Sequence, residues 1–133
     1  MGLDTYLFAD KLNTKANFGK ETLHLFNFEY FGDNDERITF RGKIYNQFIS
    51  KITDGEVSLY SDELTSDNVK LVSKKLDEWI FFADKGAHVN ADPSDLAINN
   101  PNWPVSDKME QIRDLAILFR TYANLDGEGY GFW

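Results

Sequence analysis

The chain has 133 residues, the usual size of one domain, and its 22 acidic and 14 basic side chains give a net charge of −8. This charge disfavours nucleic-acid partners, and because there is no cysteine, disulfides and thiolate metal sites are excluded. No apolar run approaches the roughly 18 residues of a membrane span, and the first residues lack the pattern of a signal peptide, so we expect a cytoplasmic protein without a membrane segment.

Alternating apolar residues predict two strands in the first part of the chain, over residues 3–9 and 22–31. The polar segment 11–20 between them suits a hairpin connection. The sequence Gly-Asp-Asn-Asp at residues 32–35 predicts a turn after the second strand.

After this turn the apolar spacing changes to the 3.6-residue period of an amphipathic helix, which is predicted to run from Phe40 to Ile52. Thr39 is the predicted N-cap of this helix, and the Asp-Gly pair at residues 54–55 is predicted to end it. A short strand over residues 56–60 is expected next.

The second helix has the clearest start signal in the chain. Thr65 is the predicted cap, and Leu64 and Val69 on either side of it have the spacing of a hydrophobic staple. One apolar stripe then follows, formed by Val69, Val72, Leu76, Trp79, Ile80 and Ala83. Residues 84–105 contain all 3 prolines and little periodicity, so they are predicted to form a long irregular loop.

A third helix is predicted from its N-cap, Ser106, with Phe119 and Tyr122 on its inner face. The glycines at 127, 129 and 131 follow this helix rather than opening one, which favours a C-cap at Gly127 and a closing strand over a phosphate-binding loop. The sequence therefore predicts a single α+β domain over residues 1–133, with a small antiparallel sheet of about four strands packed against about three helices.

Few side chains are grouped as a catalytic or metal centre would require. His88 lies in the long loop near Asp84, Asp92 and Asp95, which is the nearest approach to a general-base or metal arrangement. This spacing corresponds to no recognised motif. We therefore predict no catalytic residue, no metal site and no cofactor.

Arg41 and Gly42 are two locally unfavourable choices side by side in the first turn of the first helix. The helix dipole disfavours a cation there, and glycine costs roughly 1 kcal/mol relative to alanine within a helix. One interpretation is tertiary, with Arg41 paired to a buried carboxylate or Gly42 allowing close packing. The other is a solvated arginine beside a tolerated glycine.

The 11 Phe, 6 Tyr and 3 Trp residues are more than the predicted core positions use. The helix stripes assign four of them to the core: Phe40, Phe48, Trp79 and Phe119. The consecutive large residues 79–82 cannot all face one way on a helix, so Phe81 or Phe82 is expected to point toward a loop or a partner. Trp103, flanked by two prolines, and Trp133 are further candidates for a lid or an interface anchor.

Two patterns carry a resemblance to known proteins. Phe-Arg-Gly-x-x-Tyr at residues 40–45, followed by Ser-Leu-Tyr at 58–60 and Leu-x-x-Trp at 76–79, resembles a pattern in small uncharacterised bacterial proteins. The start Met-Gly-Leu-Asp-x-Tyr-Leu is similar to that of short bacterial and phage proteins. The resemblance implies no activity, but it marks certain positions for attention: Arg41, Gly42, Tyr60 and Trp133.

Three functions fit these observations. The first is a non-catalytic, acidic protein-binding accessory module of a bacterium or phage, immunity-like or inhibitor-like, in which charge selects a protein partner and aromatic side chains anchor it. Its predicted binding residues are Arg41, Tyr60, Phe81, Phe82, Trp103 and Trp133. The second is a small-ligand-binding protein or enzyme with a pocket under the 84–105 loop, using Arg41 and His88. The third is a self-associating structural protein, a homo-oligomer that pairs the edge of its sheet.

Overall fold

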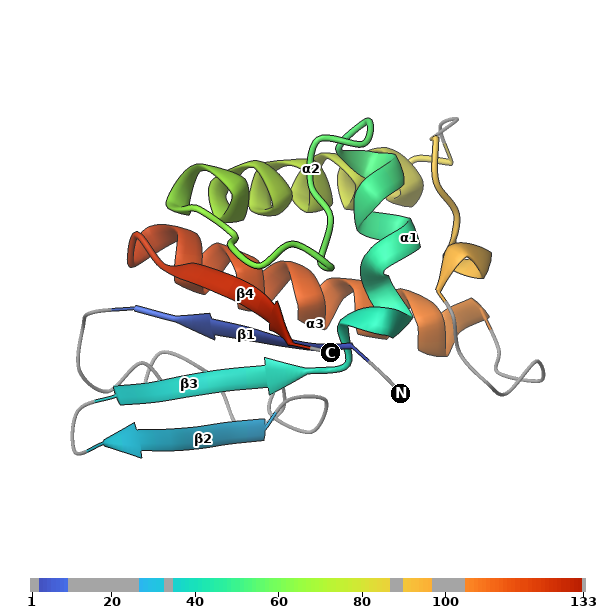
Figure 1. The fold of residues 1–133 in the computed structure, drawn as a ribbon. Helices are drawn as coiled ribbons and strands as arrows, with labels where there is room; N and C mark the ends of the chain where they lie inside the picture. Colours follow the sequence, from blue (N-terminus) through green and yellow to red (C-terminus); the bar gives the residue numbers. More distant parts are fainter. Residues whose placement is uncertain (1–2, 10–26, 33–34, 87–89, 97–104, 133) are drawn as a thin grey trace.

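The computed structural model describes residues 3–9, 27–32, 35–86, 90–96 and 105–132. In these residues an antiparallel sheet packs against three α-helices, so the predicted α+β class is confirmed (Figure 1). Within the described part of the chain no helix is long and apolar enough to cross a membrane.

Within the described residues the sheet has four strands in the order β2-β3-β1-β4, and each neighbouring pair is antiparallel. The strands are β1 (Asp4–Phe8), β2 (Asn27–Gly32), β3 (Asp35–Phe40) and β4 (Glu128–Phe132). The first and last strands are neighbours, so the two ends of the domain meet in the sheet (Figure 1). On β1, Leu7 faces the core whereas Tyr6 and Phe8 face the other side, as the two-residue period requires.

Three helices cover one face of this sheet: α1 (Gly42–Ile52), α2 (Ser66–Asp84) and α3 (Val105–Asn124). The long helices α2 and α3 lie side by side, and α1 leads from the end of β3 toward α2 (Figure 1). A short 3₁₀ turn, η3 (Pro93–Asp95), lies between α2 and α3 in the sequence and contacts both α1 and α3.

The start of the first helix was predicted wrongly. Thr39 and Phe40 belong to β3, and α1 begins at Gly42 with Arg41 as its N-cap. Strand β3 pairs with β1 on one side and β2 on the other, which fixes residues 35–40 as extended backbone. Ile38 and Phe40 both face the core, as alternate residues of a strand do. Phe40 also has the spacing of the apolar residues in the helix that follows, so the sequence pattern assigned it to the helix.

The expected strand over residues 56–60 is also absent, because this segment is a loop. Val57 and Leu59 are buried and alternate with polar residues, which imitates a strand pattern although residues 56–60 are not a strand. At the C-terminal side, α3 begins at Val105, so Ser106 lies within the helix. The left-handed residue after α3 is Asp126, with φ of 54°, rather than Gly127.

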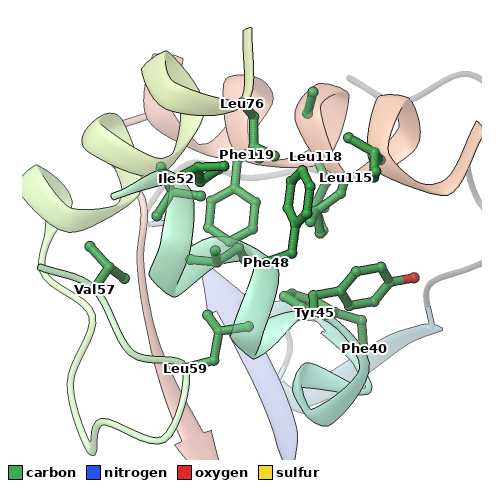
Figure 2. Packing of buried hydrophobic residues seen from close by; sticks show 14 of the residues in the cluster. Phe40, Tyr45, Phe48, Ile52, Val57, Leu59, Leu76, Leu115, Leu118 and Phe119 are labelled. Carbon is green, nitrogen blue, oxygen red and sulfur yellow. The ribbon is translucent and has the colours of Figure 1, made fainter. Parts of the chain in front are cut away.

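The core lies between the sheet and the helices, and Figure 2 shows side chains from α1, α2, α3 and the 53–65 loop meeting there. The four predicted core aromatics are all buried: Phe40, Phe48, Trp79 and Phe119. The rings of Phe48 and Trp79 meet edge-on with centroids 5.0 Å apart, an arrangement that aromatic pairs prefer.

Gly42 allows α1 to pack closely on β1, which confirms one of the tertiary interpretations. A Cβ atom at this position would overlap Thr5 Oγ1 and would lie 3.0 Å from Leu3 Cδ2. The helix penalty of glycine is therefore compensated by a contact that no larger residue permits.

The buried Tyr45 gives the fold a defined response to alkaline pH. Its hydroxyl donates to Gln111 Oε1 at 3.2 Å, and burial, with a smaller contribution from Asp114, raises the pKa of Tyr45 from 10.0 to about 12. The stabilisation from this group is present below about pH 10 and is lost as pH rises through 12, an effect of about 2–3 kcal/mol. We expect urea titrations to show this loss in the wild type and a smaller one in Tyr45→Phe; equal losses would contradict it.

The predicted start of α2 is confirmed as a capping box. Thr65 Oγ1 accepts from the Asn68 N–H at 3.1 Å, and Asn68 Oδ1 accepts from the Thr65 N–H at 3.0 Å. Thr65→Ala removes the first of these bonds, so we expect the free energy of unfolding to fall by about 1 kcal/mol, with little change in Thr65→Ser. An alanine variant as stable as the wild type in urea unfolding would contradict this role.

Candidate functional site

The most distinctive surface is formed by the segment between α1 and α2, residues 53–65, which we call the acidic loop. Its sequence contains four carboxylates and neither lysine nor arginine. The side chains of Val57, Leu59 and Leu64 are buried in the core and fix the loop from within. The Leu59 N–H also donates to Asn46 Oδ1 of α1 at 2.8 Å. The loop is therefore held in one shape although it has no regular secondary structure.

The acidic loop is joined to strand β4 by backbone hydrogen bonds. Leu64 and Gly129 exchange two of them, at 2.7 and 2.9 Å, and the Gly131 N–H donates to the Ser61 carbonyl at 2.9 Å. This approach needs glycine, because a Cβ at Gly131 would overlap the carbonyl oxygen of Leu59. The outer edge of β4 is thus already paired, so self-association through a free sheet edge would have to use β2 among the described strands.

Two exposed aromatic side chains flank this junction. Tyr60 precedes Ser61 and is 45% exposed, and Phe132 follows Gly131 and is 65% exposed. Asp62 and Glu63 follow Ser61 directly and are exposed, and Asp54 and Glu56 are exposed nearer the start of the loop, where Asp54 lines a hollow with Phe82. The surface combines large apolar side chains with a rim of negative charge, and its backbone is fixed by the core and by β4.

Arg41 lies at the same end of the sheet as Phe132. Its guanidinium is 3.7 Å from the carboxylate of Asp4, and Asp4 pairs with Phe132 across β1 and β4. The side chains of Arg41 and Asp4 are 55% and 42% exposed, so the predicted pairing of Arg41 with a carboxylate is present but the carboxylate is not buried. The structure thus gathers Arg41, Tyr60 and Phe132 near one end of the sheet. Trp133, the next residue, lies outside the described residues.

The other predicted pair, Phe81 and Phe82, lies elsewhere, on the C-terminal half of α2. Both point away from the core, being 54% and 47% exposed, as the run of four large residues indicated. Their rings meet edge-on at 5.4 Å, and Lys85 Nζ lies 4.4 Å from the centre of the Phe81 ring. Trp103 lies outside the described residues.

Residues 90–96 of the predicted long loop are fastened to the helices. Trp79 Nε1–H donates to the Ala91 carbonyl at 2.8 Å, and Lys51 Nζ is 2.7 Å from Asp95. Hydrogen bonds from the Ser94 hydroxyl and N–H lower the pKa of Asp92.

An open hollow of about 540 Å³ lies beside this segment, and Asp84, Asp92 and Arg113 are among its lining residues. Arg41 and Lys51 are at opposite ends of α1, ten residues or about 15 Å apart along the helix. Since Lys51 contacts Asp95, Arg41 lies far from this part of the predicted loop. Among the described residues that line the hollow, the cation is Arg113, which the sequence did not single out, and His88 lies outside the described residues.

Neither a metal site nor similarity to a known protein assigns a function to these surfaces. Among the described residues no group of three or more His, Cys, Asp or Glu side chains is placed to hold a metal ion. Comparison with protein-family models, with curated proteins and with solved structures finds no match to the chain.

The sequence identified Tyr60 but missed its surroundings. The sequence predicts only a closing strand around Phe132, and the carboxylates between residues 54 and 63 enter the prediction only through the net charge. The sequence does contain a signal for this surface. Residues 53–65 include four acidic residues and no basic one, and apolar residues that must be buried lie among them. The pairing of this segment with Gly129 and Gly131 is a tertiary contact that local patterns do not encode.

Proposed function

We propose that this chain is a non-catalytic, acidic protein-binding accessory module, and that the acidic loop together with Phe132 binds a basic partner protein. The observation that carries the proposal is the combination at one place of exposed Tyr60 and Phe132 with the exposed carboxylates of a fixed loop. An immunity-like or inhibitor-like role fits a small module whose main chemical feature is such a surface.

The aromatic side chains supply the anchors. Tyrosine and phenylalanine bury on the order of 150–250 Å² each, and truncating an aromatic hot spot typically costs 2 kcal/mol or more of binding free energy. Because Leu59, Leu64 and β4 already hold the loop, little conformational entropy remains to be lost on binding. Both effects favour Tyr60 as the strongest single contact.

The carboxylates supply selectivity. The chain carries a net charge of −8, and the acidic loop concentrates negative charge beside the anchors. Opposite charge accelerates encounter and suppresses acidic competitors, and the rate gain falls as salt screens it. The partner surface is therefore expected to be rich in lysine or arginine around an apolar centre.

The test is retention of proteins from the source cell on the immobilised chain and on variants matched in exposure and charge. Tyr60→Ala and Glu63→Lys alter the proposed surface. Phe81→Ala and Glu110→Lys make the same changes at exposed positions elsewhere, on α2 and α3.

We expect a basic protein to be retained by the wild type and by both control variants. Tyr60→Ala should weaken its binding about 30-fold, and Glu63→Lys should weaken it mainly at low salt. Retention of no protein at either low or moderate salt would count against the proposal, and so would equal loss in the control variants.

A further inference from the structure

A second surface, on the outer side of α2 and α3, has a different character. Three ion pairs cross from α2 to the α3 side: Lys70–Asp126 at 2.8 Å, Asp77–Arg120 at 2.5 Å and Asp84–Arg113 at 2.5 Å. As the numbers rise along α2 they fall along α3, so the helices are antiparallel. Positions 70, 77 and 84 are seven residues apart, which places them on one stripe of α2 about two turns from each other.

Apolar side chains lie between the last two ion pairs. Ile80 and Phe81 of α2 and Ala116 and Ile117 of α3 line an open groove of about 480 Å³. Phe81 is 54% exposed there. The surface is thus an apolar strip bounded at each end by a bridge of opposite charges.

We propose that a second copy of this chain covers the α2–α3 surface, with the twofold axis of the dimer parallel to the two helices. Such an axis places α2 of one copy over α3 of the other at the same level. Asp77 then faces Arg120 of the second copy, and the other two ion pairs are matched in the same way. Each bridge becomes a group of four alternating charges, and the two apolar strips meet between them.

The charge pattern favours both this twofold axis and a second copy of the chain as the partner. A twofold axis perpendicular to the helices would instead place α2 over α2, and in the register that joins the two apolar strips Asp77 would face Asp84 and Arg120 would face Arg113, which is repulsive. The three acids and three bases of the bridges sum to zero, whereas the whole chain carries −8. Two copies therefore approach with less repulsion at this surface than at the acidic loop. The inference does not depend on the proposed function, because the two surfaces share no residue.

The size of the surface predicts a weak dimer. The stripe from position 70 to 84 is about 21 Å long, and two helices side by side are about 20 Å wide. The area buried in both copies together is then about 800–1,000 Å², at the lower end for specific complexes, so we expect a dissociation constant in the micromolar range.

Sedimentation equilibrium on the full chain and two charge variants tests the proposal. In Asp77→Lys the second ion pair presents two positive charges, and in Arg120→Glu it presents two negative charges. Each variant alone would have to bring like charges together, but an equimolar mixture restores opposite charges across the interface. The altered side chains are about half exposed, so both variants should fold, which circular dichroism checks.

We expect the wild type to dimerise with concentration, each variant alone to bind itself at least tenfold more weakly, and the mixture to recover the wild-type affinity. Glu63→Lys, in the acidic loop, should dimerise like the wild type. A monomer mass up to millimolar concentration would overturn the proposal. Undiminished dimers in both variants would overturn it too, as would a mixture no tighter than its components. None of these results depends on whether the acidic loop binds a partner.

Discussion

Replacing Phe48 with alanine is expected to lower the free energy of unfolding by about 3–5 kcal/mol. The Phe48 ring is fully buried on α1 (Figure 2), and it meets Trp79 of α2 edge-on with ring centroids 5.0 Å apart. Its removal leaves a cavity between these helices as well as losing the transfer free energy of the ring. Since a domain of this size is stabilised by only about 5–15 kcal/mol, the change should be evident in a single urea titration.

Phe82→Ala is the matched control for this prediction. Phe82 is 47% exposed on α2, so its loss should change the unfolding free energy by no more than about 0.5 kcal/mol. Similar effects of the two substitutions would mean that Phe48 is not at the centre of the core.

Gly131→Val is expected to cost about 3 kcal/mol or more and to detach the acidic loop from β4. The added Cβ would overlap the Leu59 carbonyl and would lie 3.2 Å from the Ser61 carbonyl, which now accepts the Gly131 N–H. The loop must move, and its hydrogen bond to β4 must lengthen or break. Hydrogen exchange should therefore accelerate at the Gly131 amide beyond what the global loss of stability explains.

Phe132→Ala gives the comparison for Gly131→Val, because it removes a 65% exposed ring from the same strand and leaves Gly131 and its backbone contacts with the loop unchanged. It should leave both stability and amide exchange close to those of the wild type. If Gly131→Val behaved in the same way, the loop would not depend on its contact with β4.

Local signals predicted the elements whose determinants are close in sequence. Thr65, Asn68 and the Leu64–Val69 spacing lie within one turn of the start of α2, and the structure confirms this start. By contrast, β3 is defined by its pairing with β1, about thirty residues earlier, and the helical spacing of Phe40 concealed it. Val57 and Leu59 show the reverse error, because burial of a loop produced the period of a strand.

The candidate site was predictable only in part for the same reason. Phe81 and Phe82 belong to a run of large residues that cannot all face the core, Tyr60 is marked by the resemblance to small bacterial proteins, and all three are exposed. The neighbourhood of Tyr60 depends on the contact of Leu64 with Gly129, which are 65 positions apart in the sequence. No periodic pattern encodes a contact of that range, so the sequence showed the anchor but not the surface to which it belongs.

The most direct test of the acidic loop as a protein-binding surface is photo-crosslinking in the source cell, with a photoreactive phenylalanine in place of Tyr60 and, separately, of Phe81. The two positions are both exposed, 45% and 54%, but Phe81 lies in the groove between α2 and α3. We predict that position 60 captures one basic protein, that position 81 does not capture it, and that Glu63→Lys reduces the capture. No product from position 60, or the same products from both positions, would contradict the proposed function.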